Sequence, residues 1–401
     1  MDSSHLILQI TALFVLMFFV SRVLRRFGVP AIISFLMIGF LAKGWIPHES
    51  GELLEIFKEA GIILLFFFLG LEYSFERLKG MINIWKPGVI DLSFNLVPVF
   101  LLALAFGFDP VTALIIAGVF YPSSTSIVAK LLMDFRRLAS PEADLLIGIL
   151  IFEDLVSIIL ISILTPMVEA GGFDPIQLPL STLKMVLVLV AFYLLHRFGV
   201  PRVQGWLDRS SEDETFVFFM LGLLLFVGIS FKGLGLSEAL GAFLLGVLVP
   251  ETRVMENIEK HLSAFKELSI GVFFFFFAYE SELSMPEDIS FLILLAILGV
   301  VLKVVSTYLC AVVFGLKRKA RLRASLSFVA RGEFSVVIAS LEPSVKILSI
   351  PFIFFTAVVG SFLFAVAPKV ADLIYPPKKR GRPRFSQAQI AFPQGRRKAK
   401  P

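Results

Sequence analysis

The chain has 401 residues, of which 57% are hydrophobic and only 17% are charged, and its mean hydropathy is +0.88. Soluble domains carry roughly a quarter charged residues, so this composition excludes a soluble globular protein. The formal net charge is +5, but the basic residues fall between hydrophobic segments and in the tail, as topology signals do, which speaks against nucleic acid as a partner. Composition therefore indicates a polytopic protein of the lipid bilayer.

Membrane-spanning helices need roughly 20 mostly apolar residues, and this rule predicts about thirteen segments. In chain order they lie near residues 5–21, 29–44, 53–74, 87–107, 110–131, 143–168, 180–197, 214–231, 236–250, 266–282, 289–315, 322–342 and 349–374. The first is not a signal peptide, because its basic residues Arg22, Arg25 and Arg26 follow the apolar stretch instead of preceding it. We therefore expect it to be retained as a helix.

Basic residues predict the orientation, because Lys and Arg accumulate in cytoplasmic loops. Roughly thirty of the 37 lie on alternate loops and in the C-terminal tail. The other side receives Lys43, Lys58, Lys184, Lys232 and Lys346. The sequence thus predicts a multi-pass protein of the cell membrane, with the N-terminus outside and the C-terminus in the cytoplasm.

The odd number of segments has a topological consequence. If the seventh segment is a linker, the six before it and the six after it enter the membrane from opposite sides, which is the inverted-repeat plan of many transporters. We therefore predict an all-α transmembrane domain over residues 1–375. Residues 376–401 are rich in Pro and basic residues and are predicted to form a disordered cytoplasmic tail.

The sixth segment carries two adjacent carboxylates, Glu153 and Asp154, near its middle. A charge at mid-bilayer costs at least about 2.5–3.5 kcal/mol, so such residues are candidates for function. Neighbours on a helix point about 100° apart, so only one of the two can face a given site squarely. The alternative is a structural pair bonded to neighbouring helices.

The fifth segment is interrupted near its centre by Pro122, which is followed by Ser123, Ser124 and Thr125. Proline removes a backbone hydrogen bond, and a broken helix survives in a membrane only where it is buried in protein or lines a cavity. The freed carbonyls and the hydroxyls are hard oxygen ligands that suit an alkali cation. The alternative is a proline kink whose hydroxyls bond back to the helix.

The twelfth segment carries Arg331 and Glu333 around Gly332, at the position that corresponds to the fifth segment in the inverted-repeat scheme. Two interrupted helices in corresponding positions point to a transport site. The alternative is a pair of charges that neutralises helix ends where the two breaks meet, without touching the ion.

Lys303, in the eleventh segment, is the remaining deep charge. We expect it either to pair with Asp154 and leave when a cation binds, or to extend to an interface. Four carboxylates lie nearer segment ends, where a hydrated carboxylate costs little, and are expected to be mostly structural. The single cysteine, Cys310, is expected to be a small buried residue that can form no intrachain disulfide. These carboxylates are Glu72, Asp91, Glu238 and Glu280.

Five motifs occur in a specific order and spacing. They are Phe67-Phe-Leu-Gly-Leu-Glu72, Ser123-Ser-Thr-Ser-Ile-Val-Ala-Lys130, the stretch from Gly148 to Asp154, Leu240-Gly-Ala-Phe-Leu-Leu-Gly246 and Ala330-Arg-Gly-Glu-Phe-Ser335. In these residues the chain resembles the monovalent cation:proton antiporter-2 family, over nearly all of residues 1–375. The resemblance implies an NhaA/NapA-like antiporter fold, with thirteen helices arranged as a dimerisation domain and an ion-carrying core in which two broken helices cross beside an essential aspartate.

That aspartate corresponds to Asp154. Family members usually place Asp or Gln before it, and Glu153 is a departure shared with KhtU-like potassium/proton exchangers, so the resemblance favours potassium. Lys303 matches a lysine of sodium/proton antiporters, which keeps sodium as the next choice. Glutathione-gated members continue into a nucleotide-binding domain, but no Gly-x-Gly-x-x-Gly follows the last segment here. Any gating would therefore need a separate cytosolic subunit, and the fold implies a homodimer.

The mechanism expected from these residues is competition. Asp154 binds either a proton or a dehydrated cation, Ser124 and Thr125 complete the shell, and no cofactor is needed beyond the transported K⁺ or Na⁺ and H⁺. The alternatives are a proton-coupled carrier of an organic anion, with Lys303 or Arg331 as counter-charge, and a cation channel, for which no filter-like sequence is found. A soluble enzyme is excluded, because the chain has no catalytic Cys/His set and no phosphate loop.

Overall fold

The computed structural model describes residues 3–25, 31–42, 51–73, 83–172, 177–280 and 289–376, and every regular element in these ranges is helical. The predicted tail beyond residue 376 lies outside the described residues. The helices are α1 (Ser3–Arg25), α2 (Ala31–Leu41), α3 (Gly51–Glu72), α5 (Trp85–Ala105), α6 (Pro110–Phe120), α7 (Thr125–Asp134), α8 (Ala143–Glu169), α9 (Gln177–Leu194), the π-helix η3 (Leu195–Gly199), α10 (Val200–Ser210), α11 (Phe216–Gly233), α12 (Glu238–Leu248), α13 (Arg253–Glu280), α14 (Ile289–Val313), α15 (Arg318–Leu326), α16 (Glu333–Ala339) and α17 (Pro343–Ile374).

The all-helical class predicted from the sequence is confirmed over the described ranges. Eight stretches there are long and apolar enough to cross a membrane, with α6 and α7 counted together as Pro110–Asp134. Shorter apolar helices occupy Thr11–Leu24, Glu59–Leu71 and Glu238–Leu248. The number of thirteen spans therefore stays a prediction.

Two elements are longer than hydropathy alone predicts. α13 begins at Arg253, and its first half mixes charged residues with Val254, Ile258 and Leu262, which are buried. α9 continues through η3 into α10, so one helical stretch connects the two predicted halves. A hydropathy window marks only the apolar part of such helices, because it ignores which face of a helix is covered by neighbours.

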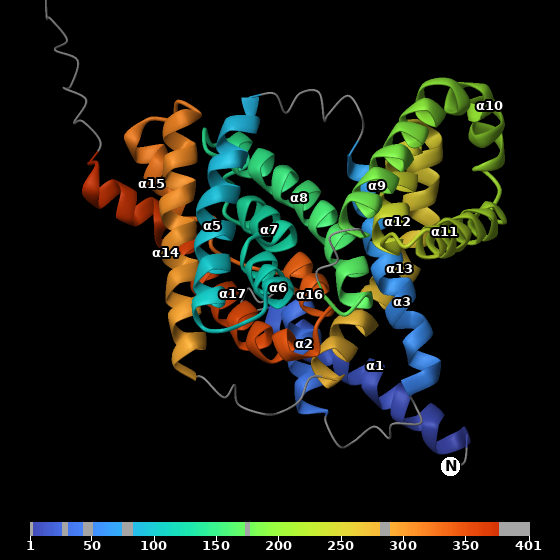
Figure 1. Ribbon diagram of the computed structural model, residues 1–401, viewed down its shortest axis with the longest axis horizontal. Helices are drawn as coiled ribbons and strands as arrows, with labels where there is room; N and C mark the ends of the chain where they lie inside the picture. The colour runs from blue at the N-terminus through green and yellow to red at the C-terminus, as the bar shows by residue number, and fades with distance from the viewer. Residues whose placement is uncertain are drawn as a thin grey trace, which may run out of the picture.

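The helices gather into two groups, and Figure 1 shows α5 and α14 of one group on the left and α3, α12 and α13 of the other on the right. In the first, which we name the core group, α14 packs on α5 and α15, and α16 packs on α6 and α17. In the second, the scaffold group, α3 packs on α12 and α13, and α2 packs on α1 and α13. α8 contacts both groups, because it packs on α5, α6 and α16 and also on α9 and α12.

Close backbone contact holds the scaffold group together. A β-carbon added to Gly70 of α3 would overlap the Phe243 carbonyl of α12, and one added to Gly246 of α12 would overlap the Phe67 carbonyl of α3. Small residues let helix backbones approach in membranes, where apolar side chains gain little from leaving lipid. These two glycines therefore set the α3–α12 distance.

The fifth and twelfth predicted segments are each two helices separated by non-helical chain. α6 ends at Phe120 and α7 starts at Thr125, while α15 ends at Leu326 and α16 starts at Glu333. Both interruptions lie in the core group and are buried almost completely. Broken helices at membrane depth need such cover, because their free backbone groups find no partners in lipid.

Candidate functional site

The two helix breaks meet at the centre of the core group. The Ser124 amide donates to the Ala330 carbonyl at 2.8 Å, and the Ser335 hydroxyl donates to the Val119 carbonyl at 2.7 Å. Each break thus satisfies backbone groups that the other leaves free. A β-carbon on Gly332 would overlap the Ser124 side chain, so the crossing needs glycine at this position.

Arg331 and Glu333 serve opposite helix ends at this crossing. Arg331 is fully buried and donates to carbonyls of Phe120 (2.9 Å) and Val329 (3.2 Å), which places its charge at the C-terminal end of α6. Glu333 accepts from the Ser126 amide at 3.2 Å and from the Ser124 hydroxyl at 2.9 Å, at the N-terminus of α7. Each charge has the sign that its helix end favours. The geometry matches the structural alternative for both residues.

Asp154 lies on α8 directly beside the crossing and has no exposed surface. Its carboxylate accepts the Thr125 hydroxyl at 3.0 Å and the Tyr73 hydroxyl at 2.8 Å. Thr125 is the first residue of α7, and Tyr73 follows α3 of the scaffold group. The carboxylate therefore lies between the two helix groups and is bonded to both.

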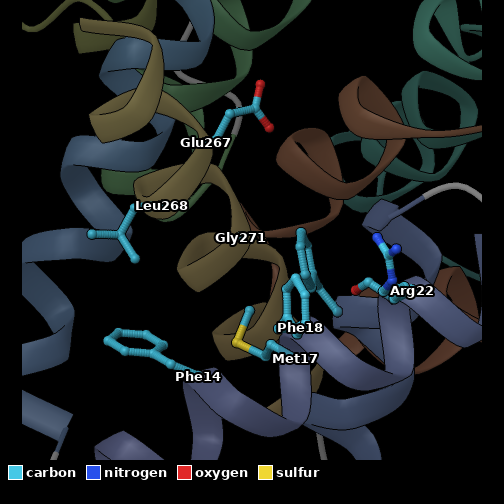
Figure 2. Close-up of a pocket in the computed structure, with 9 residues that line it drawn as sticks. Phe14, Met17, Phe18, Arg22, Glu267, Leu268 and Gly271 are labelled. Carbon is cyan, nitrogen blue, oxygen red and sulfur yellow. The ribbon is translucent and has the colours of Figure 1, made fainter.

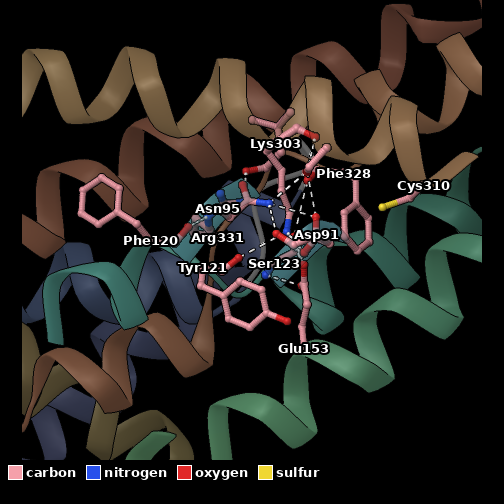
Figure 3. A network of polar contacts seen from close by, with 12 residues as sticks. Asp91, Asn95, Phe120, Tyr121, Ser123, Glu153, Lys303, Cys310, Phe328 and Arg331 are labelled. Carbon is pink, nitrogen blue, oxygen red and sulfur yellow. Dashed lines mark hydrogen bonds and ion pairs between the residues drawn. The ribbon is translucent and has the colours of Figure 1, made fainter. Parts of the chain in front are cut away.

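Glu153 points to a different set of partners, as adjacent positions on a helix require. Its carboxylate accepts the Ser123 amide at 2.6 Å and forms an ion pair with Lys303 (Figure 3). Lys303 also pairs with Asp91 of α5 at 2.8 Å and donates to the Tyr121 carbonyl at 3.2 Å. Lys303, Glu153 and Asp91 have no exposed surface.

Two sequence-based expectations are wrong here. Lys303 neither pairs with Asp154 nor extends to an interface, because Glu153 and Asp91 bind its ammonium group. Asp91 is not a hydrated carboxylate at a helix end, since it is fully buried and also accepts from Asn95 (3.0 Å) and Ser306 (2.8 Å). Asp91 lies six residues after the start of α5, so the hydropathy pattern places it near the membrane surface. The packing of α14 over α5 excludes the water.

The other expected structural residues follow the prediction where they are described. Cys310 is buried and its thiol lies 3.0 Å from the Pro87 carbonyl. Glu238 pairs with Lys232 at 3.1 Å between α11 and α12. The side chains of Glu72 and Glu280 lie outside the described residues.

A cavity of about 540 Å³ separates the core group from the scaffold group, and we name it the interface cavity. Its core-side wall includes Thr125, Ser126 and Glu333, and α2, α3 and α13 line it opposite. Lys130 and Glu267 lie at its exposed part, with side chains 41% and 73% exposed. Since Thr125 both lines this cavity and bonds to Asp154, one hydroxyl separates the buried carboxylate from accessible space.

Sequence analysis missed Tyr73 and Ser157 near Asp154. Ser157 lies one turn further along α8, and its buried hydroxyl has no hydrogen-bond partner among the described residues, as is also true of the Tyr121 hydroxyl. Buried hydroxyls of this kind are usually satisfied by water or an ion. The spacing of Ser157 from Asp154 could have revealed that residue, whereas no local pattern brings Tyr73 to the site.

Over the described ranges, no group of three His, Cys, Asp or Glu side chains has the spacing of a metal site. Asp154 offers a carboxylate beside the hydroxyls of Thr125 and Tyr73.

Several known proteins resemble this chain over most of its length. The family model described as "Sodium/hydrogen exchanger, transmembrane" matches residues 10–371. The chain is 33% identical to the ammonium/proton antiporter subunit AmhT of Alkalihalophilus pseudofirmus, over 91% of this chain and 94% of that protein. It is 27% identical to the potassium/proton antiporter subunit KhtU of Bacillus subtilis, over 84% and 86%.

The solved structure of the sodium/proton antiporter MjNhaP1 of Methanocaldococcus jannaschii aligns with a TM-score of 0.59 at 16% identity, covering 92% of this chain and 98% of that one. At this identity the likeness concerns the fold. The match of the family model over nearly the whole chain is more specific, and with it the chain belongs to the transmembrane sodium/hydrogen exchanger family.

Proposed function

We propose that this protein exchanges a monovalent cation for protons by competition at Asp154. The observation that carries the proposal is the placement of this one buried carboxylate against the crossing of two broken helices, one hydroxyl away from the interface cavity. A proton and a dehydrated cation both need this carboxylate, so one leaves before the other binds. Transport is then coupled and depends steeply on pH.

The neutral oxygen ligands for the cation are the hydroxyls of Thr125 and Tyr73, which bond to Asp154, and the hydroxyl of Ser124. Ser123 orients Glu153 through its amide. Arg331 and Glu333 hold the crossing, and Pro122 with Gly332 allow the two breaks. Lys303 compensates the charges of Glu153 and Asp91, and Asp154 takes the transported charge. These roles explain why the site combines several buried charges that would each be costly alone.

Potassium is the cation we expect first, because Glu153 is shared with KhtU-like exchangers. Sodium is next, because Lys303 matches a lysine of sodium/proton antiporters. The antiporter subunits AmhT and KhtU, which act on ammonium and potassium by name, add ammonium to the set that needs testing. Both names contain the word subunit, which supports a separate cytosolic regulatory subunit for this chain as well. We further propose thirteen spans in two inverted repeats, a homodimer, and a cytoplasmic C-terminus in the cell membrane.

The alternatives from the sequence have less support. An organic-anion carrier needs a cation that can meet its substrate, but carboxylates bind Lys303 and backbone carbonyls bind Arg331. A cation channel would conduct without exchanging the cation for a proton at Asp154. The relatives named above are antiporters, which favours neither alternative.

The experiment that tests the function is proton flux in proteoliposomes with an imposed pH gradient, scanning potassium, sodium, lithium and ammonium. We expect Asp154→Asn to abolish cation-dependent proton movement, and Asp154→Glu to retain part of it with a shifted cation dependence. Asp144→Asn is the matched control, because Asp144 lies on the same helix and is exposed. Exchange that survives Asp154→Asn, or flux of cation without proton movement, contradicts the proposal.

A further inference from the structure

A second cavity, of about 410 Å³, lies between α1 and α13 beside α2 (Figure 2). Its apolar wall consists of Phe14, Met17, Phe18, Phe35, Leu268 and Gly271. It shares Phe35 and Glu267 with the interface cavity, so the two cavities are neighbours along α13. Its volume lies in the range of small-molecule sites, roughly 300–1,000 Å³.

Three polar side chains line this otherwise apolar space. Ser21 is only 6% exposed, and its hydroxyl has no hydrogen-bond partner in the described part of the chain. Arg22 makes no ion pair within the same ranges, and Glu267 is 73% exposed with Lys266 of its own helix 3.6 Å away. Arg22 comes from α1 and Glu267 from α13, so one positive and one negative residue line the cavity from different helices (Figure 2).

This combination specifies the chemistry of the occupant. The aromatic and methionine side chains of α1 fit an acyl chain, while Arg22 fits a phosphate and the Ser21 hydroxyl can donate to an ester or phosphate oxygen. Glu267, which has Lys266 of its own helix 3.6 Å away, can accept a further positive group on the same molecule. A primary ammonium with N–H donors can bond to this carboxylate, whereas a trimethylammonium has no N–H donor and a glycerol headgroup carries no positive charge.

We propose that the cavity binds one ethanolamine phospholipid, with its phosphate on Arg22, its ammonium on Glu267 and an acyl chain along Phe14, Met17 and Phe18. The headgroup then lies at the edge of the interface cavity, because Glu267 and Phe35 line both spaces. The lipid ties α1 to α13 within the scaffold group and neutralises one of the charges at that edge.

The test uses the full-length protein, purified and delipidated in detergent, and three lipids with identical dioleoyl chains: phosphatidylethanolamine, phosphatidylcholine and phosphatidylglycerol. Native mass spectrometry counts lipids per chain. We expect one phosphatidylethanolamine to bind about tenfold more tightly than either other lipid, as one additional charge-assisted hydrogen bond provides. This readout involves no transport, so its outcome is independent of the cation exchange proposed above.

Three variants and two controls make the assignment specific. Met17→Trp fills the cavity and is expected to lose the tightly bound lipid, while Phe19→Trp adds bulk at an exposed neighbour that does not line the cavity and retains it. Glu267→Gln is expected to remove the preference for ethanolamine, and Arg22→Gln to weaken both phosphatidylethanolamine and phosphatidylcholine. Glu259→Gln, an exposed change on the same helix, retains the preference.

Equal binding of the three lipids overturns the proposal, as does unchanged binding by Met17→Trp. A change in the oligomeric state of Met17→Trp, without a change in bound lipid, assigns the cavity to a second copy of the chain and also overturns it. If Met17→Trp fails to fold, the Arg22→Gln and Glu267→Gln variants still decide, because both side chains reach the surface.

Discussion

At the scale of single residues, the site depends on buried charges whose partners come from different helices. Lys303 forms ion pairs with two carboxylates, those of Asp91 and Glu153. Breaking a buried pair leaves an uncompensated charge and costs about 3–5 kcal/mol, whereas removing both partners together can cost less. The three residues should therefore respond to substitution as a unit.

We expect Lys303→Met to destabilise the protein more than Asp91→Asn does, because the former leaves two carboxylates unpaired and the latter leaves none. The double variant Asp91→Asn/Lys303→Met should be more stable than Lys303→Met alone. Thermal unfolding in detergent, followed by tryptophan fluorescence, measures all three. Additive losses would show that Asp91 and Lys303 do not interact energetically.

A second residue-scale prediction concerns Tyr73. Tyr73→Phe keeps the ring, which lies 5.9 Å from that of Phe243, and removes the hydroxyl that Asp154 accepts. A hydrogen bond to a charged group contributes roughly 1.5 kcal/mol or more, so the apparent KM for the cation should rise by about tenfold. Flux at varied cation concentration measures it, with Tyr279→Phe on α13 as control. An unchanged KM would remove Tyr73 from the site.

At the scale of elements, the crossing of α6–α7 with α15–α16 depends on space as well as on charge. Gly332 lies against the Ser124 side chain, and no β-carbon fits between them. Since protein interiors are close-packed, a single added methyl group there must displace one of the two chains. The crossing is therefore sensitive to small substitutions that leave every charge in place.

We expect Gly332→Ala to lower folded yield and thermal stability, by about 1–3 kcal/mol or more as overpacking does. Gly332→Ala/Ser124→Gly removes the overlapping side chain and should recover part of the loss. Ser124→Gly alone is the control, because it reports the loss of the hydroxyl that caps α7 and contacts Glu333. A double variant no better than Gly332→Ala would mean that the clash is not the cause.

At the scale of the whole molecule, the interface cavity approaches Asp154 to within one hydroxyl, that of Thr125. The cavity reaches Lys130 on α7, and the basic loops predict that this side is cytoplasmic. The opposite end of α8 lies at Glu169 and Ala170. Transport needs a second conformation, which motion of the core group against the scaffold group can supply, as rigid-body rocking does in inverted-repeat transporters.

Thiol labelling tests this orientation, since the one native cysteine, Cys310, is buried. Ala129→Cys, in the wall of the interface cavity, should react with an impermeant maleimide in inverted vesicles and not in right-side-out vesicles. Ala170→Cys, which is exposed beyond α8, should show the reverse. The opposite pattern for both would reverse the predicted topology, and excess cation should slow labelling of Ala129→Cys only.

The sequence by itself determined the membrane class and the helical content, and it marked residues 122–125, 153–154 and 331–333 as candidates for function. An apolar composition, a proline and a charge in mid-segment can each be recognised from the local sequence. A helix break or a charge in lipid costs free energy, so each of them points to a buried and specialised position. Hydropathy does not predict the ends of α13 or of the α9–α10 stretch, because the amphipathic extensions of these helices are not apolar enough to stand out.

Only the tertiary structure decided which charge meets which. Asp91, Glu153 and Lys303 lie on three different helices, and Tyr73 reaches Asp154 from the other helix group. Their pairing depends on how α5, α8 and α14 pack and turn, and each of these helices is apolar on several faces, so its sequence leaves its rotation open. The sequence therefore identified Glu153 and Lys303 as deep charges but not Asp91, and helix packing assigned their partners.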